Sequence, residues 1–270
     1  AFEKTLADDG ALILKFWMHL SREAQKDRLR KLEKNPLLHW RISKRDWQHW
    51  ELYDQFMAAA ERTIMKTSTG LAPWKIIEGY DERYRSIAVA TIIRDAIRFR
   101  LDEAGKVSIG SNGDASARSK PAATEVSDSP PVTILSRLDM SKTLAKGDYE
   151  ADLKRYQAKL NQLQRAAREH KVSTILVFEG WDAAGKGGSI RRITAALDAR
   201  DYQVIQIAAP TDEEAAHNYL WRFWRHIPRA GKVTIYDRSW YGRVLVERIE
   251  GFAGTREWQR AYAEINDFEA

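Results

Sequence analysis

The stretch with the clearest chemical meaning is a glycine-rich run with one lysine, EGWDAAGKGG, at residues 179–188. The spacing Gly180-x-x-x-x-Gly185-Lys186 fits a phosphate-binding loop, in which main-chain N–H groups point at the phosphate and the lysine adds a full positive charge. The loop residues that we predict to bind phosphate are Gly180, Ala183, Ala184, Gly185, Gly187, Gly188 and Ser189. The alternative interpretation is a turn whose glycines only let a strand and a helix pack closely.

This loop departs from the usual pattern at one position, because Gly187 stands where a serine or threonine normally holds magnesium. Asp182, inside the loop, supplies carboxylate oxygens, which are the ligands that Mg²⁺ prefers in proteins. We therefore predict that Asp182 holds the metal and that Lys186 binds the same phosphates as the loop.

A second acidic residue, Asp237, follows the apolar run at 232–236, where a strand is expected to end. An acid at the carboxyl end of a strand, placed after a phosphate-binding loop, has the layout of a magnesium-binding Walker B aspartate. We therefore predict Mg²⁺ between Asp182 and Asp237. The alternative is an ordinary carboxylate in the turn that follows a strand.

The residues after Asp237 carry further charged groups. Arg238 and Arg243 have planar guanidinium groups that can bind two phosphoryl oxygens at once. Glu247 lies one helical turn beyond Arg243, so it either pairs with that arginine or positions substrate or a second metal. Both possibilities stay open at this point. The predicted catalytic residues are Asp182, Lys186, Asp237, Arg238, Arg243 and Glu247.

Strands and helices alternate in the second part of the chain. Apolar runs predict strands at 172–178, 203–208 and 232–236, and the spacing of apolar residues predicts helices at 147–170, 189–199, 212–226, 240–250 and 256–270. This alternation predicts an α/β fold with a mostly parallel sheet and right-handed crossovers. Ligands of such folds bind at the carboxyl ends of the strands, where the loop and Asp237 are expected.

The first part of the chain has the same kinds of elements and more positive charge. Strands are predicted at 11–17 and 72–78, and helices after the N-cap residue Ser21, from Ser43 to about residue 66, and at 82–101. Arg22, Lys26 and Arg30 share one face of the first helix, and a basic, aromatic loop that contains Arg41 follows. An anion-binding face and an ordinary solvated face explain this charge equally well.

Between these parts, residues 102–131 are dominated by Gly, Ser, Ala, Asp and Pro and contain no aromatic residue. This composition predicts a flexible linker. It divides the chain into a first part at 1–101 and a second part at 132–270.

The overall composition limits where the protein is expected to act and what it is expected to bind. The chain has no cysteine among its 270 residues, which excludes a disulfide framework and a cysteine nucleophile and fits a cytoplasmic protein. Its apolar runs are too short to span a bilayer, so we expect no membrane contact. The net charge of +6 predicts a polyanionic partner. We do not expect nucleic acid, because no nucleic-acid-binding motif accompanies the charge.

Three of these stretches resemble the polyphosphate kinase 2 family. EGWDAAGKGG at 179–188 is similar to its Walker A loop, YDRSWYGRVLVER at 236–248 to its Walker B segment, and the run from Lys15 to Trp47 to its later half with a basic lid. The resemblance implies a P-loop kinase-like, three-layer α/β/α fold with a helical basic lid, in which Arg22, Lys26, Arg30 and Arg41 belong to the lid. It also implies Mg²⁺-dependent transfer of a phosphoryl group from inorganic polyphosphate to a nucleotide, and a homo-oligomer.

The order of these stretches differs from that of the family, because the lid half precedes the Walker A loop here. We expect an excerpt of a tandem protein, with the second half of one copy at 1–101 and the first half of the next at 132–270. A circularly permuted single copy is the alternative. The tandem arrangement points to AMP as the acceptor, giving ADP, and it makes it doubtful that the lid residues serve the site at 180–247.

Two other functions stay open on the sequence alone. An ATP-dependent nucleoside monophosphate kinase would use the same loop and differ in its phosphate donor. A nucleotide- or polyphosphate-binding module without turnover would need the same positive charge but no catalytic lid.

Overall fold

The computed structural model describes residues 11–36, 39, 42–70, 72–106 and 133–269. Helix α5, which spans Glu82–Lys106, includes the first residues of the predicted linker, and most of that linker lies outside the described part of the chain. The predicted lid residue Arg41 lies outside it as well.

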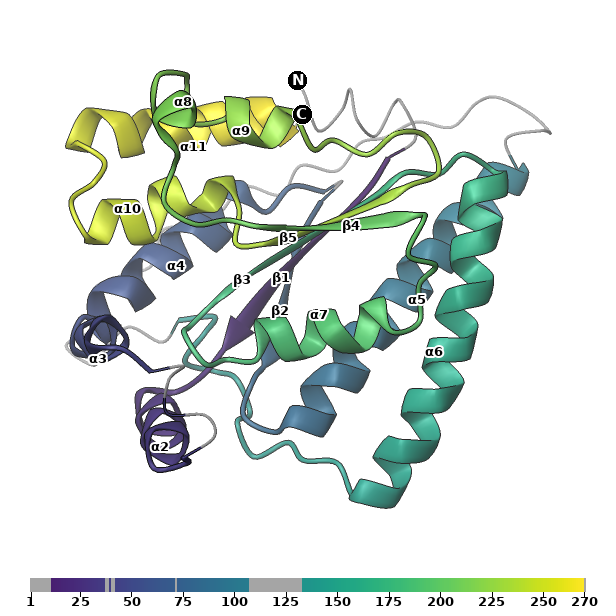
Figure 1. The fold of residues 1–270 in the computed structure, drawn as a ribbon, viewed down its shortest axis with the longest axis horizontal. Helices are drawn as coiled ribbons and strands as arrows, with labels where there is room; N and C mark the ends of the chain where they lie inside the picture. Colours follow the sequence, from purple (N-terminus) through teal and green to yellow (C-terminus); the bar gives the residue numbers. More distant parts are fainter. Residues whose placement is uncertain (1–10, 37–38, 40–41, 71, 107–132, 270) are drawn as a thin grey trace.

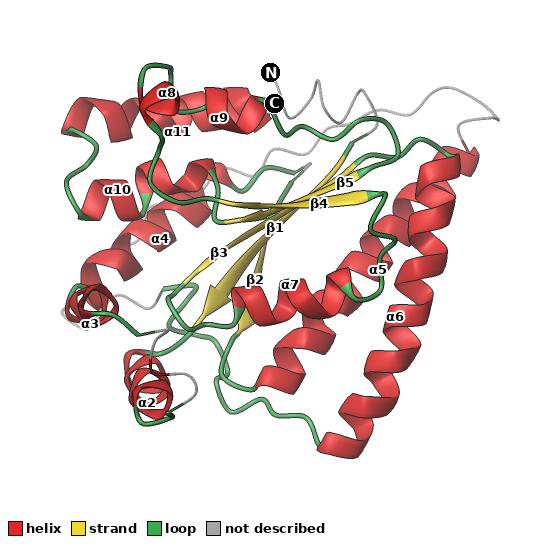
Figure 2. Cartoon of the chain, viewed as in Figure 1, coloured by secondary structure: helices red, strands yellow, loops and turns green. Residues whose placement is uncertain are grey.

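One five-stranded sheet joins the two parts of the chain (Figure 2). Its strands are β1 (Leu12–His19), β2 (Trp74–Glu78), β3 (Thr174–Gly180), β4 (Tyr202–Gln206) and β5 (Val233–Asp237). Their order is β2-β1-β3-β5-β4, and all four pairings are parallel, as the alternation of elements predicted. Strand β1 of the first part pairs with β3 of the second from Leu12↔Thr174 to Met18↔Gly180.

The central strands β1 and β3 are buried almost throughout, since helices cover both faces of the sheet. The rings of Phe16 and Phe178 stack between these strands with their centroids 5.0 Å apart. Lys15 is also fully buried in β1, where its Nζ lies 2.8 Å from Glu269 Oε2 and donates to Thr67 O at 2.7 Å. The core therefore includes an ion pair between β1 and the last described helix.

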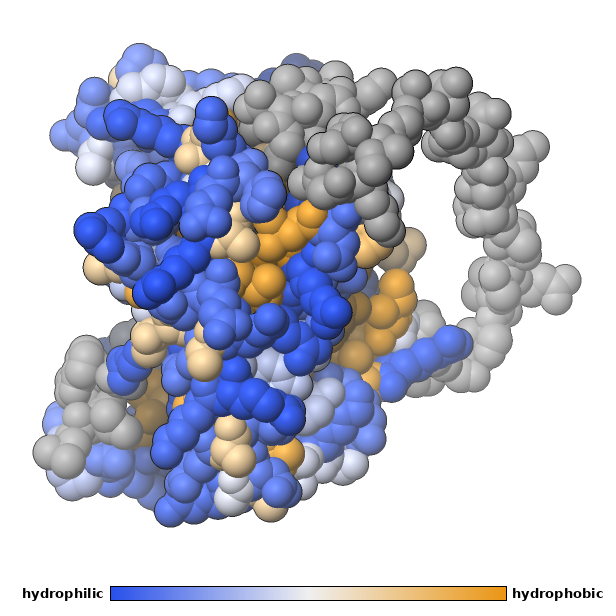
Figure 3. Space-filling view, turned by 90° about the vertical axis from the view of Figure 1, so that its right-hand side faces the viewer, coloured by the Kyte–Doolittle hydropathy of each residue, from blue (hydrophilic) through white to orange (hydrophobic). Residues whose placement is uncertain are grey.

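Helices form a layer on each side of the sheet (Figure 1). The α5 helix, α6 (Lys146–Glu169) and α7 (Lys186–Thr194) lie on one side, where they contact one another. The helices α4 (Tyr53–Thr67), α10 (Val246–Ile249) and α11 (Thr255–Glu269) lie on the other side. The fold is therefore the predicted three-layer α/β/α arrangement around a parallel sheet. The surface towards α5 and α6 is mostly hydrophilic (Figure 3).

Two further helices, α2 (Arg22–Glu33) and α3 (Lys44–Glu51), lie at the carboxyl edge of the sheet (Figure 1). Ser21 caps α2 as predicted, because its side chain accepts a hydrogen bond from Ala24 N. Within the described residues, no helix is both long and apolar enough to span a membrane.

Three predicted helices are each divided into two elements in the structure. The helix predicted from Ser43 to about residue 66 is two helices, α3 and α4, separated at Leu52, which has φ −85° and ψ 13°. The helix predicted at 212–226 is two short ones, α8 (Asp212–Ala215) and α9 (Trp221–Trp224). Between them the side chain of Asn218 accepts from Leu220 N, a local bond that competes with helix.

The third difference is at 240–250, where a 3₁₀ turn, η2 (Trp240–Val244), precedes α10. The side chain of Ser239 begins the turn by accepting from Tyr241 N, and Leu245, at φ −108° and ψ −100°, ends it. As a result, Arg243 and Glu247 lie on different short elements and not on one continuous helix.

Candidate functional site

The predicted phosphate-binding loop at 180–185, which we call the phosphate loop, connects the end of β3 to the start of α7, and its conformation requires glycine at two positions. Gly180 has φ +137° and Gly185 has φ +99°, both in the left-handed region that other residues rarely adopt. A Cβ atom at Gly180 would lie 2.3 Å from the carbonyl oxygen of Met18, and one at Gly185 would lie 2.1 Å from Arg85 Nε. These glycines let the loop pass close to β1 on one side and α5 on the other.

Helix α7 begins at Lys186, three residues before the predicted start, so the loop runs directly into its first turn. The N–H of Ala184 donates to Trp181 O at 3.1 Å, and that of Ser189 donates to Gly185 O at 3.0 Å. The N–H groups at 185–188 belong to the helix start, where helix geometry supplies no acceptor and favours an anion. Of the predicted phosphate-binding residues, Ala184 therefore has its N–H engaged within the loop itself.

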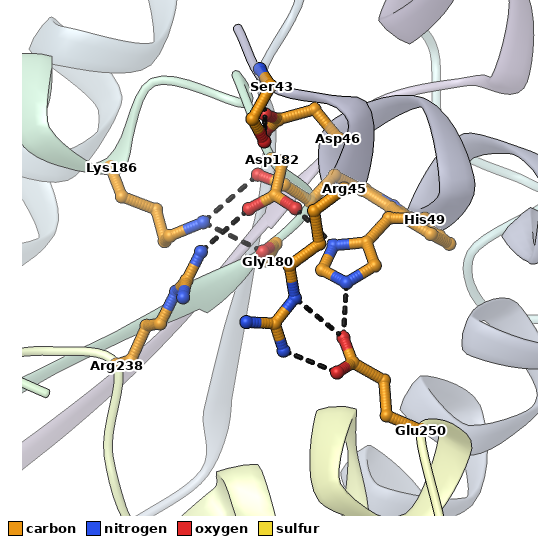
Figure 4. A network of polar contacts seen from close by, with 10 residues as sticks. Ser43, Arg45, Asp46, His49, Gly180, Asp182, Lys186, Arg238 and Glu250 are labelled. Atoms are coloured by element: carbon orange, nitrogen blue, oxygen red, sulfur yellow. Dashed lines mark hydrogen bonds and ion pairs between the residues drawn. The ribbon is translucent and has the colours of Figure 1, made fainter. Parts of the chain in front are cut away.

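Lys186 is buried, and its ammonium group turns back over its own loop (Figure 4). Its Nζ donates to Gly180 O at 2.8 Å and to Trp181 O at 3.0 Å. Burial lowers the pKa of Lys186, and Arg238 acts in the same direction, whereas Asp182, Asp237 and Glu179 act against them. These three acids and Arg238 therefore surround the lysine closely enough to affect its charge.

Asp182 has both carboxylate oxygens engaged (Figure 4). Its Oδ1 accepts from Arg238 Nη2 at 2.8 Å, and its Oδ2 lies 2.6 Å from His49 Nδ1. Burial raises the pKa of Asp182, but His49, Lys186 and Arg238 together hold it well below its usual range. The carboxylate is therefore ionised and held by His49 of α3 and by Arg238, which follows β5.

His49 is a site residue that the sequence analysis missed. Its Nε2 contacts Glu250, which also pairs with Arg45, so the ring lies between two carboxylates (Figure 4). Burial lowers the pKa of His49, but Asp182 and Glu250 outweigh it and raise the pKa. A histidine within a basic, aromatic stretch was the only signal in the sequence, and it did not indicate a partner so far away in the chain.

Asp237 ends β5 beside the loop strand, because it pairs in register with Phe178. Arg238 follows in the left-handed region, with φ +67°, and its N–H donates to Phe178 O at 3.0 Å. Asp182 and Asp237 therefore come to the same edge of the sheet, as predicted. The strained conformation of Arg238 turns the chain here, and its side chain reaches Asp182.

A second missed residue, Glu179, lies beneath this edge. It is buried, and its Oε1 accepts from Ser239 N at 2.7 Å and from Ser239 Oγ at 2.8 Å. Burial raises the pKa of Glu179 to about 7, although Ser239, Lys186 and Arg238 act in the opposite direction. Glu179 thus ties the strand before the phosphate loop to the segment after β5.

Arg243 and Glu247 form the ion pair that one interpretation of the sequence allowed, with Nε and Oε2 3.1 Å apart. The guanidinium group of Arg243 also lies 4.4 Å from the ring centroid of Tyr219. Both residues line the same cavity as Asp182, so the ion pair leaves them beside the site.

That cavity has a volume of about 770 Å³ and is lined by residues of both parts of the chain. Gly180, Asp182 and Arg238 line it at the phosphate loop, and His49 and Arg45 line it from α3. Residues 207–210, with Phe223 and Val246, provide an apolar wall. The cavity therefore combines charged with apolar lining residues, as small-molecule sites commonly do.

The predicted lid residues lie at the surface of α2. Arg22 Nη1 pairs with Asp54 Oδ2 at 3.2 Å, Lys26 Nζ lies 4.6 Å from the ring centroid of Trp50, and Arg30 is exposed. None of these three residues lines the cavity. Another basic residue of this helix, Arg28, does reach the phosphate loop and donates to Ala183 O at 2.6 Å.

In the part of the chain that the structure describes, no three His, Cys, Asp or Glu side chains gather into a group that could hold a metal by themselves. Two carboxylates near a phosphate-binding loop are nevertheless a donor set that suits Mg²⁺, which commonly takes its other ligands from substrate phosphates and water.

Comparison with known proteins gives a match over most of the chain. The family model described as polyphosphate kinase 2 matches residues 1–104 and 143–270. A polyphosphate:AMP phosphotransferase of Pseudomonas aeruginosa is 48% identical over 268 residues, which are 99% of this chain and 52% of that protein. The protein of the same name from Pseudomonas syringae pv. tomato is 49% identical over 271 residues, 99% of this chain and 52% of its own length.

A third relative, an ADP-polyphosphate phosphotransferase 3 of Rhizobium meliloti, is 40% identical over 132 residues, which are 49% of this chain and 46% of that protein. The chain thus spans about half the length of the first two relatives.

Proposed function

Since the chain belongs to the polyphosphate kinase 2 family, we propose that its site transfers a phosphoryl group from inorganic polyphosphate to a nucleotide, converting AMP to ADP. The observation that carries this proposal is the cavity that joins the phosphate loop to an apolar wall. The names of the two Pseudomonas relatives support AMP as the acceptor.

In-line phosphoryl transfer asks a protein mainly for alignment and for compensation of charge. In our proposal the N–H groups at 185–188 and Lys186 bind the donor phosphates. Arg238, which is exposed at the edge, and Arg243, in the cavity wall, stabilise the charge of the phosphoryl group that moves. The acceptor phosphate is already anionic, so no residue has to remove a proton from it.

Magnesium, when bound, would neutralise phosphate charge, and Asp182 and Asp237 are the residues that would hold it. In this structure both Asp182 oxygens accept bonds from His49 and Arg238. A metal would either use their remaining lone pairs or take the place of one cationic partner.

The acceptor nucleotide would place its base against residues 207–210 and Phe223. Its phosphate would then face Arg243 and Arg238 across the cavity. This orientation brings donor and acceptor phosphates together above Asp182. A homo-oligomer remains a prediction from the family resemblance, and a cytoplasmic location remains a prediction from the absence of cysteine. Light scattering of the purified protein tests the assembly.

An assay of ADP formation from AMP tests the proposal, with either polyphosphate or ATP as the donor. We expect polyphosphate, in the presence of Mg²⁺, to support turnover at least about tenfold faster than ATP, because the family resemblance implies polyphosphate as the phosphoryl donor. Faster turnover with ATP would instead identify a nucleoside monophosphate kinase. Binding of AMP and polyphosphate without any ADP would identify a binding module.

A further inference from the structure

Helix α2 carries several basic residues, and Arg28 differs from the three assigned to the lid because it turns inward. Its Nη1 donates to Ala183 O at 2.6 Å, and its Nη2 donates to Gly79 O at 3.0 Å and also to Tyr80 O. All three acceptors are main-chain carbonyl groups. The guanidinium group of Arg28 therefore bonds to the main chain of two loops and not to a carboxylate.

These two loops follow the strands on either side of β1. The segment with Gly79 and Tyr80 follows β2, and the phosphate loop follows β3, while α2 itself comes after β1. Gly79 N also donates to His19 O at 2.7 Å, at the end of β1. Arg28 therefore fastens together the carboxyl ends of three neighbouring strands, and one of its bonds falls inside the phosphate loop.

The carbonyl group that Arg28 holds belongs to a residue in an unfavourable conformation. Ala183 has φ +62°, in the left-handed region where a residue with a Cβ atom is strained. Such a conformation persists only where its surroundings stabilise it. A hydrogen bond from a charged group to Ala183 O is the stabilising contact that the structure shows.

A second arginine supports the same loop from α5. Arg85 is buried, its Nη1 donates to Gly79 O at 2.9 Å, and its Nε would lie 2.1 Å from a Cβ atom at Gly185. It packs on the loop without bonding to Ala183 in any contact of the described residues. Arg28 therefore remains the direct restraint on the strained residue.

We propose that Arg28 is a positioning residue for the phosphate loop, which holds Ala183 in its left-handed conformation and so keeps the N–H groups at 185–188 arranged for phosphate. This role rests on the proposed function of the loop, because it concerns the affinity for a phosphate donor. It assigns to the first part of the chain a direct part in building the site of the second.

Binding of inorganic polyphosphate, followed by isothermal titration calorimetry, tests the proposal in a double-mutant cycle. We expect Arg28→Ala to weaken binding about tenfold, as loss of one charge-assisted bond implies. In the Ala183→Gly background the same change should weaken binding about threefold or less, since glycine adopts positive φ without strain. Lys31→Ala, an exposed basic residue of α2, is the matched control for loss of charge and should stay within about twofold.

Equal losses from Arg28→Ala in both backgrounds would overturn the proposal, because a residue that binds polyphosphate directly cannot be replaced by a flexible loop. Arg28→Lys, which keeps the charge but not the fork, should recover part of the affinity and provides the test if Arg28→Ala does not fold. Full recovery by lysine would also contradict a role through two loops. If the wild-type chain binds no polyphosphate, the proposed function fails. Because the mutant cycle measures binding and not turnover, it tests the role of Arg28 separately from catalysis.

Discussion

The phosphate loop and helix α2 lie at the same edge of the sheet, but they are fixed in different ways. Residues of the loop itself determine most of its course, through two glycines with positive φ and a helix that begins at Lys186. Side chains determine what α2 contributes, since Arg28 bonds the loop while Lys26 lies on Trp50. The contrast shows that a site can combine a part encoded locally with a part that depends on distant partners.

The largest effect is expected when one carboxylate in the phosphate loop and one in α2 are each replaced by an amide. We expect Asp182→Asn to lower the rate of phosphoryl transfer by about a hundred- to a thousandfold, because the amide cannot balance the cationic groups around it or hold a metal. Asp27→Asn, at an exposed position of α2, should leave the rate within about twofold. Rates are measured as ADP formed from AMP and polyphosphate.

Wild-type turnover by Asp182→Asn would remove the loop carboxylate from the mechanism. A comparable loss from Asp27→Asn would show instead that α2 acts through its overall charge, and the distinction between the two regions would fail.

A second test concerns the main chain of the loop itself. We expect Gly180→Ala to lower the free energy of unfolding by about 3 to 5 kcal/mol, because the new methyl group meets Met18 O and the residue must keep a positive φ. Gly187→Ala is the matched change, since a Cβ atom there meets no atom within 4 Å, and it should leave the free energy of unfolding unchanged or raise it by up to about 1 kcal/mol, because alanine favours the helix. Urea unfolding measures both. Equal losses would mean that close approach does not fix the loop.

The parts of this site that could be predicted from the sequence are those that neighbouring residues encode. The strand, the glycine spacing and the lysine correctly placed a loop between a strand and a helix, and the acid after an apolar run correctly placed Asp237 at the same edge of the sheet. Each of these two predictions depends on a run of about ten neighbouring residues. The extent of the helix at 240–250 was wrong because Ser239 and Leu245 break it through local conformations that apolar spacing does not reveal.

The contacts between the two parts could not be predicted for a different reason. His49 and Asp182 are 133 residues apart, and Arg28 and Ala183 are 155 apart. Their meeting depends on β1 and β3 being neighbours in the sheet, which the order of segments in the sequence does not state. Helical spacing grouped Arg22, Lys26 and Arg30 on one face, but it could not show that Arg28, between those positions, faces the loop.

The smallest effect that we predict is a pH dependence of stability. It separates the contribution of one side chain, Glu179, from that of the main chain in the second part. Glu179 is buried, and its pKa rises from 4.5 to about 7 on folding. Its protonated form is therefore favoured in the folded protein, so the stability that it contributes is complete below about pH 4.5 and is lost as the pH rises through about 7. A pKa difference of this size corresponds to a total loss of about 3 kcal/mol, most of which falls between pH 5 and pH 8.

Glu179→Gln keeps the acceptor for Ser239 but does not ionise, so it should remove this loss. We expect the variant to gain about 2 to 3 kcal/mol relative to the wild type when urea unfolding is compared at pH 8 and at pH 5. If the variant and the wild type differ in unfolding free energy by the same amount at both pH values, the pKa of Glu179 does not change on folding. In that case the bond to Ser239, not the burial of charge, would be what the side chain contributes below the phosphate loop.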